Sequence, residues 1–410
     1  MKRIRDRVGG LDVHRDTVMA CARVVEAGEV FEEVEQFSTT SVGVGRLGAW
    51  LVARGVSTVA MEATGVYWKP VYYGLEGLFE ELWVCNAMHV KNVPGRKTDI
   101  ADAVWLADVV AHGMVRASFV PPPPIRELRE LTRYRKTQVD ARVKEIQRLE
   151  KVFQDASIKI TSVASTVWSA SARDITEALI AGEHDPEVLA DLARGRMRPK
   201  IPELTEALTG HWGPHHSVVA RQIVDHITFL DTSIEQLSVA IGDRLGPFSG
   251  LIRLMDEVPG VNEIVAEIVI AETGADMTVF PTSAQCASWA GLAPGNHESA
   301  GKRKPTGTTN GNVWLRRALL EAARTASRTK GTYFNAQYHR IARRRGDKKA
   351  VVAVAHSILV VLWHIMATGE PYRDLGADYF DRRRDPERET TRLIRQLEAL
   401  GHTVTLEPAA

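Results

Sequence analysis

The sequence predicts a mixed α/β domain at the N-terminus, followed by a long region that is mainly helical. Before residue 120, apolar stretches typical of strands alternate with stretches of helical periodicity, whereas beyond it helical periodicity prevails. Four consecutive prolines, Pro121 to Pro124, separate the two patterns, and such a run neither continues a helix nor fits a sheet centre. The chain of 410 residues also exceeds the usual size of a single core, so we expect a domain boundary there.

The N-terminal domain is predicted to open with an antiparallel meander of three strands, after which strands alternate with helices. The expected elements are strands at 7–13, 17–25 and 29–38, a helix at 41–54, a strand at 57–63, a helix at about 67–78, a strand at 82–87 and a helix at about 99–112. The order βββαβαβα resembles the ribonuclease-H-like, or RuvC-like, layout. We assign the domain to that α/β fold by resemblance as well as by pattern.

Two long helices are predicted beyond the prolines. Apolar residues from Leu128 to Phe153 recur mostly three or four apart among charged residues, as in an amphipathic or coiled-coil helix. A second such helix spans about 218–245. The two could form an antiparallel pair or a dimer interface, and periodicity does not distinguish these. Residues 158–214 between them are helical in tendency and carry no motif.

A change of character follows Gly246, where two helical stretches are joined at Pro259-Gly260. They resemble a helix-hairpin-helix, whose turn can present backbone N–H groups to a phosphate. A plain structural hairpin is equally compatible, because Asn262 stands where the usual motif has a second glycine. The predicted domains are therefore 1–120 with the sheet, 121–245 as a helical, coiled-coil and dimerisation region, 246–375 as a mainly α C-terminal domain, and 376–410 as a tail.

Composition favours a soluble protein, with 44% hydrophobic and 25% charged residues. The three cysteines, Cys21, Cys85 and Cys286, are odd in number and far apart, which argues against a disulfide framework or a zinc site and fits a reducing cytoplasm. No signal peptide is expected, because no apolar stretch follows the N-terminal charges. The apolar segment 350–368 contains polar residues and stands alone, so we interpret it as a core helix rather than a membrane span.

Charge is distributed unevenly along the chain. The formal net charge is only +1, yet fourteen Lys or Arg residues lie between Lys302 and Lys349, against two acids, Glu321 and Asp347. A solvated helix face is the usual meaning of such a run. This density, with aromatic residues interleaved, also suits a nucleic-acid backbone.

Four acids are predicted to converge in the N-terminal domain. Asp12 and Glu62 end the first and fourth strands, and adjacent strand ends in one sheet bring their side chains together. Asp99 and Asp102 are three residues apart at the start of a helix, so their carboxylates share a face. Four hard oxygen donors suit two Mg²⁺ ions about 4 Å apart, which clamp the oxygens of a phosphodiester. The quartet predicts metal-assisted phosphoryl transfer.

Each acid also has a simpler interpretation. Asp99 and Asp102 could complement a helix N-terminus, and Asp12 could cap a turn. Two further acids lie nearby, Asp16 and Asp108. We rank Asp108 lower because it follows Asp102 by six residues and so lies off the shared helical face.

A second candidate site lies in the glycine-rich, basic loop that reads GLAPGNHESAGKRKPTGTTNGNVWLRR over residues 291–317. Ser299 is its best nucleophile candidate, because the small residue and the glycine after it allow a backbone to approach closely. Lys302, Arg316 and Arg317 could bind the flanking phosphates. In the alternative interpretation, which spacing alone favours, Ser299 only donates a hydrogen bond within a phosphate-binding loop.

Taken together, these motifs resemble the DEDD transposases of the IS110 insertion-sequence family. The segments that carry the resemblance are GLDVHRD, MEATGVYWKP, HVKNVPGRKTDIADAVWLADVVAHGMVRASFVPP, LRELTRYR, the VPGV hairpin and GLAPGNHESAGK followed by LRRALLEAAR. The family couples a RuvC-like domain to a C-terminal transposase domain. The resemblance assigns its four acids to Asp12, Glu62, Asp99 and Asp102, and its serine to Ser299.

The resemblance implies a recombinase in which Ser299 attacks a DNA phosphodiester, aided by Mg²⁺ at the acids, and forms a phosphoserine intermediate that permits religation without ATP. It also implies a homo-oligomer, dimer or tetramer, that combines acidic site and serine from different subunits, and a structured bridge RNA that selects the DNA. The residues themselves do not indicate the RNA. The expected nucleic-acid contacts are Lys97, Arg133, Arg135, Lys302, Arg303, Lys304, Arg316 and Arg317.

Two other functions stay open from the sequence. A RuvC-type structure-selective nuclease would share the acids but use water as the nucleophile. A non-catalytic nucleic-acid-binding scaffold would have a degenerate acidic site, which the intact acids disfavour. An ATP-binding protein of the actin-like fold is discounted, because the glycine-rich phosphate loops are missing after Asp12.

Overall fold

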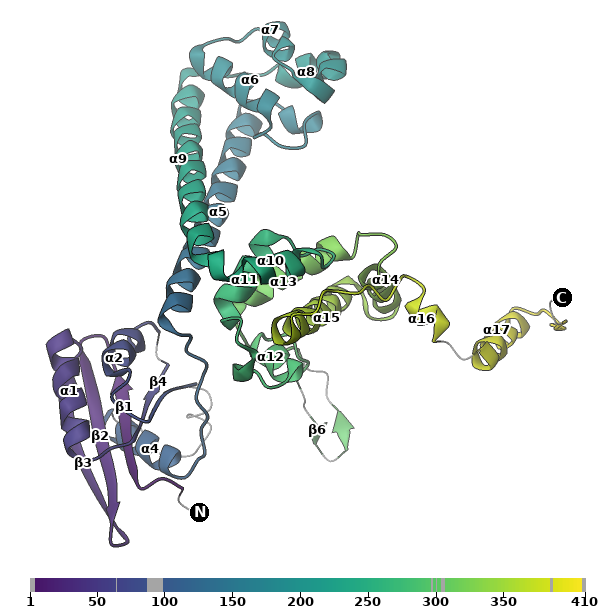
Figure 1. Ribbon diagram of the computed structural model, residues 1–410. Coiled ribbons are helices and arrows are strands. Elements are labelled where there is room, and N and C mark those ends of the chain that lie inside the picture. The colour runs from purple at the N-terminus through teal and green to yellow at the C-terminus, as the bar shows by residue number, and fades with distance from the viewer. Residues whose placement is uncertain are drawn as a thin grey trace. The chain divides into compact units, whose positions relative to one another are not determined.

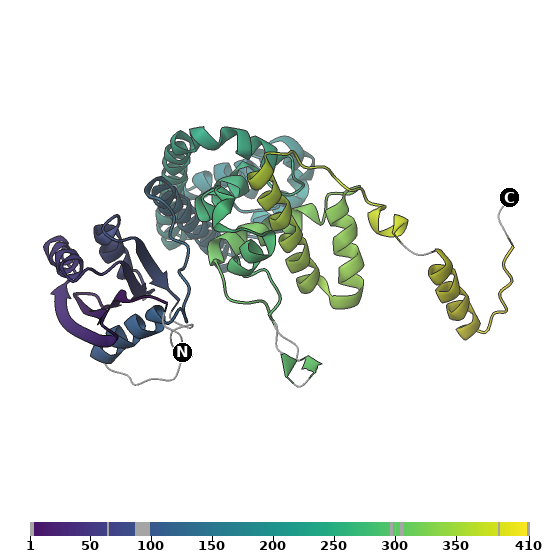
Figure 2. The same ribbon diagram turned by 60° about the horizontal axis from the view of Figure 1, so that its bottom comes forward.

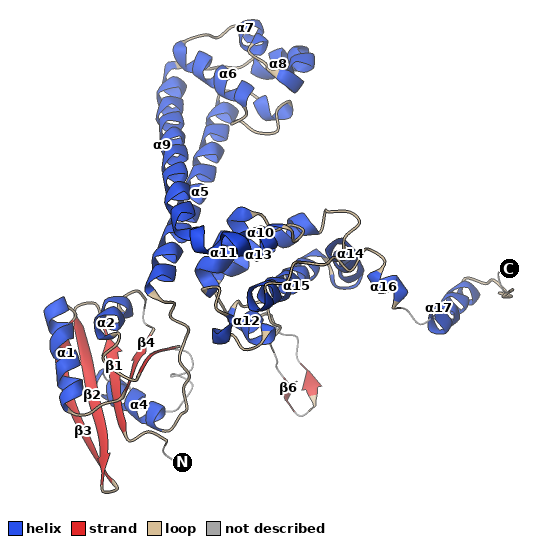
Figure 3. Ribbon diagram, in the orientation of Figure 1, coloured by secondary structure: helices blue, strands red, loops and turns tan. Residues whose placement is uncertain are grey.

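The chain divides into two compact units, Met1–Val120 and Pro121–Ala410 (Figure 1). The first holds the sheet and the second is mostly helical (Figure 3). The fold is that of a computed structural model, which describes residues 4–63, 65–86, 99–295, 298–299, 301–303, 307–383 and 386–407.

A five-stranded sheet of order β3-β2-β1-β4-β5 forms the first unit. Strands β1, β2 and β3 are an antiparallel meander, and β4 and β5 continue the sheet parallel to β1. The elements are β1 (Arg7–Val13), β2 (Thr17–Glu26), β3 (Glu29–Ser38), α1 (Ser41–Ala53), β4 (Thr58–Glu62), α2 (Trp68–Leu75), β5 (Glu81–Cys85) and α4 (Asp99–Ala111). The predicted order of strands and helices is confirmed.

Helices cover both faces of this sheet (Figure 2). Leu11 and Val13 of β1 pack with residues of α1 and α2 in one core, whereas Val8 packs with residues of α4 in another. Successive side chains of a strand point to opposite faces, so Gly10 and Asp12 lie on the same face as Val8, toward α4. The central strand is therefore buried on both sides, as its continuous apolar character requires.

Gly10 allows α4 to approach β1 closely. A Cβ atom at Gly10 would lie 2.2 Å from the Ala103 carbonyl oxygen and 2.6 Å from the Ala107 backbone nitrogen. Ala103 and Ala107 are themselves small and buried. Since a helix backbone cannot yield as a flexible side chain would, no residue larger than glycine fits without moving α4.

Gly10→Ala is expected to destabilise the first unit by about 2–3 kcal/mol, because the added methyl group displaces the α4 backbone. The measurement is the midpoint of urea unfolding of the full chain, monitored with a spectroscopic probe placed within residues 4–120. Gly45→Ala is the matched control, since its Cβ would meet nothing within 4 Å on helix α1. That substitution should be neutral or slightly stabilising. Equal midpoints for both variants would contradict the packing argument.

The second unit begins with two long helices that pack against each other, α5 (Pro123–Asp155) and α9 (Pro214–Leu245). Three contacts between acidic and basic side chains show that they run antiparallel: Glu127 with Arg244 at 3.5 Å, Glu145 with His226 at 3.3 Å and Asp155 with His216 at 3.0 Å. The structure therefore favours the antiparallel pair of the two alternatives.

The proline run itself enters the first of these helices. Pro122 is the N-cap of α5, and the next two prolines form its first turn, where a missing N–H costs no hydrogen bond. The expectation that the whole run lies outside a helix was wrong by two residues.

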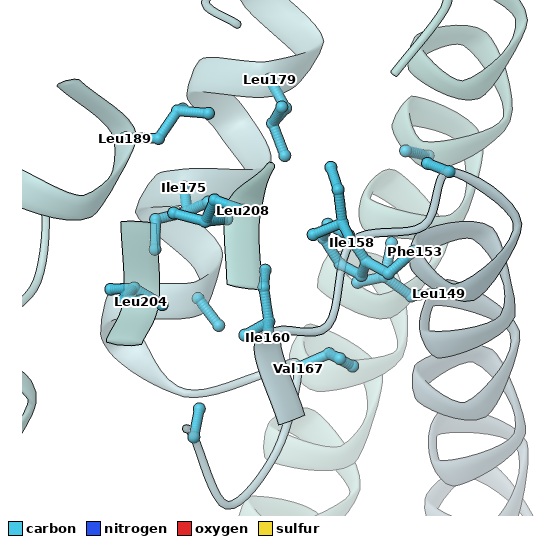
Figure 4. Packing of buried hydrophobic residues seen from close by; sticks show 14 of the residues in the cluster. Leu149, Phe153, Ile158, Ile160, Val167, Ile175, Leu179, Leu189, Leu204 and Leu208 are labelled. Carbon is cyan, nitrogen blue, oxygen red and sulfur yellow. The ribbon is translucent and has the colours of Figure 1, made fainter. Parts of the chain in front are cut away.

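Residues 158–214, which had no predicted fold, form a helical cap around the ends of α5 and α9. Its elements are η1 (Ile160–Ser162), α6 (Ala170–Ala181), α7 (Pro186–Asp191), η2 (Gly195–Lys200) and α8 (Ile201–Leu208). Leu149 and Phe153 of α5 pack with Ile175 and Leu204 in a single hydrophobic core (Figure 4). This core holds the tip of the helical pair together.

The remaining helices follow α9 in the chain, and α10 to α15 pack into a bundle in which α11 contacts α5. They are η3 (Gly246–Phe248), α10 (Ser249–Asp256), α11 (Glu263–Thr273), η4 (Met277–Val279), α12 (Ser283–Trp289), α13 (Val313–Ala326), α14 (Tyr333–Arg345) and α15 (Asp347–Thr368), followed by α16 (Tyr379–Arg382) and α17 (Pro386–Ala399). By length and composition α15 could span a membrane. Instead Val354, Ile358 and Leu362 are fully buried, and α15 packs against α12, α13 and α14, which makes it a core helix.

The hairpin between α10 and α11 packs onto α13. Gly260 has φ +86°, and a Cβ there would lie 2.2 Å from the Ala322 carbonyl oxygen. The Asn262 side chain caps α11 by accepting a hydrogen bond from the Val265 backbone N–H at 3.0 Å. Both features of the turn thus have a packing or capping role.

Candidate active site

The start of α4 lies at the end of β1 that carries Asp12. The Ile4 N–H donates to the Ala111 carbonyl at 2.9 Å, so the last residue of α4 lies beside the start of β1. Ala103 and Ala107 lie over Gly10, in the middle of the strand. Helix α4 therefore runs antiparallel to β1, and its first turn, with Asp99 and Asp102, comes to the C-terminal end of the strand.

Asp12 and Glu62 occupy neighbouring positions at that same edge. The parallel register pairs Leu11 of β1 with Met61 of β4, so the two acids follow directly at the strand ends. Residues in register on adjacent strands point to the same face, which here is the face covered by α4. The Asp12 side chain is only 14% exposed and lies 3.1 Å from His14 Nε2. The predicted juxtaposition of Asp12 and Glu62 is thus present in the backbone register.

The described acids, Asp12, Glu62 and Asp102, come to one end of one face of the sheet, and their carboxylates do not form a tight cluster there. Among the residues that the structure describes, only Asp155, His215 and His216 place three potential metal-ligating atoms within 4.8 Å of one another. Asp102 is exposed, and the Asp99 side chain lies outside the described residues. Like charges repel without a cation between them, so carboxylates that share a metal are expected to close around it.

No thiolate is expected among the potential ligands at this edge, where the described ones are carboxylates and the His14 ring nitrogen beside Asp12. Cys85 pairs with Glu62 in the β4–β5 register. Burial, and next the nearby Glu62 carboxylate, raise the pKa of the Cys85 thiol to about 12. The thiol is therefore protonated at neutral pH and is a poor metal ligand. A donor set made mainly of carboxylates, without thiolate, fits Mg²⁺.

The two nearby acids have other roles. Asp108 accepts a hydrogen bond from Arg23 Nη2 at 3.1 Å and lies 3.3 Å from His112 Nδ1. It ties α4 to β2 at the opposite end of the helix from Asp102. The Asp16 side chain is 83% exposed and lies 3.7 Å from Arg15 Nε. These positions agree with leaving both acids out of the predicted metal site.

Ser299 lies at the tip of a β-hairpin between α12 and α13. Strands β6 (Glu298–Ser299) and β7 (Lys302–Arg303) pair so that Ser299 is opposite Lys302. Gly301 supplies the turn with φ +74°, which favours glycine. The predicted phosphate-binding loop is therefore a short hairpin that sets a serine against a lysine in the strand register.

The base of this hairpin is closed by two glycines. A Cβ at Gly311 would lie 2.2 Å from the backbone nitrogen of Gly291, whose φ is +70°. The Asn312 N–H then donates to the Trp289 carbonyl at 3.0 Å. The chain thus leaves the helical bundle after Trp289 and returns to it at Asn312 side by side, and the hairpin lies between these two points.

Buried Glu272 anchors the end of the hairpin to α5. Its carboxylate accepts two hydrogen bonds from Arg133, at 2.7 and 2.8 Å, and one from Asn312 Nδ2 at 2.6 Å. The Asn312 Oδ1 atom at the same time caps α13 by accepting from the N–H groups of Trp314 and Leu315. The start of α13 is positioned by this network.

The same contacts change the interpretation of three predicted phosphate ligands. Arg133 is paired with Glu272, and Arg317 with Asp140 at 3.1 Å. Arg135 is 5% exposed and forms an ion pair with buried Glu267. A buried, paired guanidinium cannot reach a phosphate, so Arg135 is corrected to a structural residue. These arginines line a cavity of about 510 Å³ between α5, α9, α11 and α13.

Five other cations were predicted to contact nucleic acid, and the structure describes the side chains of two of them, Lys302 and Arg316. Lys302 is exposed and Arg316 half-buried, and no acidic partner lies within salt-bridge distance of either among the described residues. Lys97 and Lys304, like the side chain of Arg303, lie outside that part of the chain.

A histidine cluster that the sequence analysis missed joins α5 and α9. The Gly213 N–H donates to His216 Nδ1 at 2.9 Å, so the neutral ring carries its proton on Nε2, which donates to Asp155 Oδ2 at 3.0 Å. Both ring nitrogens are thereby used, and neither lone pair is left for a metal. We interpret this cluster, with His215 stacked beside it, as a helix cap and not a metal centre.

Two family models match the chain. One, described as "Transposase", matches residues 9–158, and the other, "Transposase IS116/IS110/IS902 family", matches residues 252–339. The first covers the sheet and most of α5, and the second covers α10 to α14. Both candidate halves of the site fall within the matched segments.

Curated relatives agree with these models. The chain is 24% identical over 382 residues to "Transposase for insertion sequence element IS1111A" of Coxiella burnetii, covering 90% of this chain and 91% of the relative. It is 28% identical over 203 residues to "Putative transposase y4pF/y4sB" of Sinorhizobium fredii, spanning only 48% of each chain. A third relative is "Insertion element IS110 uncharacterized 43.6 kDa protein" of Streptomyces coelicolor, 32% identical over 126 residues, or 29% of each chain.

Proposed function

The chain belongs to the IS110 family of transposases, and from that membership we propose that it cleaves and exchanges DNA strands through a Mg²⁺-assisted phosphoserine intermediate. One observation carries the proposal. The antiparallel course of α4 brings its acidic first turn to the strand edge where Asp12 and Glu62 lie side by side. The strand order supports a ribonuclease-H-like fold for this unit.

The residues that would hold the metal are Asp12, Glu62, Asp99 and Asp102. When bound, Mg²⁺ supplies positive charge to the phosphodiester oxygens and stabilises the charge that develops during transfer. The protein's own contribution is positional. Gly10 sets the separation of α4 from β1, and hence that of Asp102 from Asp12, while buried Cys85 stays protonated and supplies no thiolate.

Ser299 is the proposed nucleophile. Its hydroxyl oxygen forms a bond to phosphorus while the bond from phosphorus to the leaving deoxyribose oxygen breaks, and the hydroxyl proton passes to solvent as the leaving oxygen is protonated. The ester retains the energy of the broken phosphodiester, so a deoxyribose hydroxyl can reverse the step on another strand. A hairpin tip next to Lys302 suits attack on a bulky, anionic substrate.

The family implies further partners, which we include in the proposal. They are a structured bridge RNA that selects donor and target DNA, and a homo-oligomer in which the acidic site of one subunit acts with the serine of another. Substrates of this kind place the protein's action in the cytoplasm.

Replacing Mg²⁺ by Ca²⁺ is expected to slow strand cleavage about a hundredfold while leaving DNA binding intact. Mg²⁺ holds oxygen ligands at about 2.1 Å in rigid octahedral geometry, whereas Ca²⁺ binds at longer, variable distances and aligns the phosphodiester poorly. The measurement is single-turnover cleavage of an insertion-sequence end, with binding followed separately. Full activity in a chelator would show that the acids do not act through a metal.

A further inference from the structure

A group of exposed cations surrounds the junction of α13, α14 and α15, three helices that pack together (Figure 1). All of its members are exposed. We call it the α14 basic cluster, and it consists of Arg324, Arg328, Lys330, Arg343, Arg344, Arg345, Lys348 and Lys349.

None of these eight side chains has an acidic partner. Among the residues that the structure describes, no carboxylate lies within 4.0 Å of any of their charged nitrogens. Asp347, next to Lys348 in the sequence, accepts a hydrogen bond from the Tyr338 hydroxyl at 2.8 Å. In contrast, Arg133, Arg135 and Arg317 are each neutralised by a carboxylate of the same unit. The α14 basic cluster differs from these arginines in carrying charge that no described carboxylate neutralises.

The junction is concave. A hollow of about 580 Å³ is lined by three cations, Arg324, Arg328 and Lys330, and by one acid, Asp347, together with Tyr338 and His339. Like charges gathered around a hollow repel one another, and a polyanion that lies there relieves this repulsion. A single small anion would satisfy only a few of the eight cations, so the arrangement fits an extended ligand.

The polar side chains here leave little capacity for reading bases. Amide side chains are the usual readers of adenine. At this junction the Asn335 Nδ2 atom donates to the Ser327 carbonyl at 2.6 Å, and the Gln337 Nε2 atom donates to Ser357 Oγ at 2.8 Å. The remaining groups are mainly Arg and Lys donors, which bind phosphates without regard to sequence and, among the bases, read only guanine.

We propose that the α14 basic cluster binds the phosphodiester backbone of a nucleic-acid duplex, independently of its sequence. The inference rests on the proposed function, since it names a surface by which this transposase holds its nucleic acid. Three of its members, Arg343 to Arg345, form the last turn of α14, and the others come from α13, the loop after it and the start of α15. Cations on three packed helices can engage several phosphates at once.

Neutralising part of the cluster should lower the salt dependence of binding. The variant is Arg343→Gln/Arg344→Gln/Arg345→Gln in the full-length protein. The probes are a random-sequence DNA duplex and an RNA duplex of the same length. Each lost phosphate contact reduces the slope of log affinity against log salt by about 0.9, so the slope should fall by roughly 2–3, with affinity roughly 10- to 100-fold weaker at ~0.1 M salt.

Two further variants isolate the cause. Lys151→Gln/Arg196→Gln/Lys200→Gln removes three charges from exposed side chains at the helical cap, which likewise have no acidic partner among the described residues, and should leave the slope unchanged. Replacing Arg343 to Arg345 by lysine keeps the charges and should restore most of the slope.

The outcomes decide the inference without recourse to catalysis. A reduced slope with both probes supports a site for any duplex backbone, and a reduction with only one identifies that nucleic acid as its ligand. An unchanged slope with both, or an equal reduction in the cap variant, would overturn the inference. If instead the proposed chemistry is wrong, strand cleavage will be absent from the unmodified protein while these binding differences persist.

Discussion

Asp12→Asn is expected to lower the rate of strand cleavage by at least about a thousandfold, with little change in folding or DNA binding. The substitution keeps the shape of the side chain but removes the negative charge that would hold Mg²⁺ against the phosphodiester. Electrostatic stabilisation of the developing charge usually contributes more to the rate of such reactions than any other effect. The measurement is single-turnover cleavage at saturating Mg²⁺. Asp102→Asn should have an effect of the same order, because α4 brings it to the same edge.

Asp16→Asn is the matched control for this pair. It removes an equal charge four residues along the chain from Asp12, from a side chain that is 83% exposed. Its cleavage rate should stay within about twofold of the unmodified protein, as expected of an exposed surface substitution. A large loss in Asp16→Asn, or normal cleavage in Asp12→Asn and Asp102→Asn, would refute the assignment of the acidic site.

Ser299→Ala is expected to abolish the covalent protein–DNA intermediate and to reduce strand joining by at least about a thousandfold. The substitution deletes the attacking oxygen and leaves the hairpin backbone able to form, because alanine is compatible with the same strand. The measurement is a denaturing gel on which a DNA end linked to the protein is retarded, together with quantification of joined product. Metal binding at the acidic residues should be unaffected.

The result also separates the proposed mechanism from a nuclease that uses water. If Ser299→Ala retains cleavage and joining while Asp102→Asn loses them, then water is the nucleophile and the RuvC-type alternative is correct. Thr309→Ala serves as the control, since it removes an exposed hydroxyl from the same loop. Should the unmodified protein bind nucleic acid but cleave none, the scaffold alternative would account for the protein.

Much of the sheet could be predicted because the residue patterns that indicate its strands and helices are local in the sequence. Strand residues alternate with a period of two and helix residues with a period near 3.6, so the order βββαβαβα is visible in the sequence. The meander and the parallel strand β4 then follow from chain order, and they bring Asp12 beside Glu62. The boundary of α5 was missed by two residues because proline tolerates the first turn of a helix as well as a linker.

The cationic residues were harder to interpret for a different reason. Lysines and arginines can be identified in the sequence, but the acidic residues that pair with them in the fold cannot. Arg133 meets Glu272 across 139 positions of the chain, and Arg317 meets Asp140 across 177. A single sequence contains no sign of such distant pairs, so a basic motif at residues 133–135 resembled a phosphate site although its charges are neutralised within the fold.

By itself, then, the sequence indicated which residues could perform chemistry, namely the acids at strand and helix ends and the serine followed by a small residue and a glycine. It also indicated the family to which these motifs belong. Only the tertiary structure decided how they are presented. Gly10 permits α4 to lie against β1 and so brings Asp102 toward Asp12, two glycines close the base of the Ser299 hairpin, and buried carboxylates neutralise some arginines while leaving the α14 basic cluster unpaired. The physical reason is that close packing and charge compensation depend on distances between residues far apart in the chain, and local periodicity does not encode these distances.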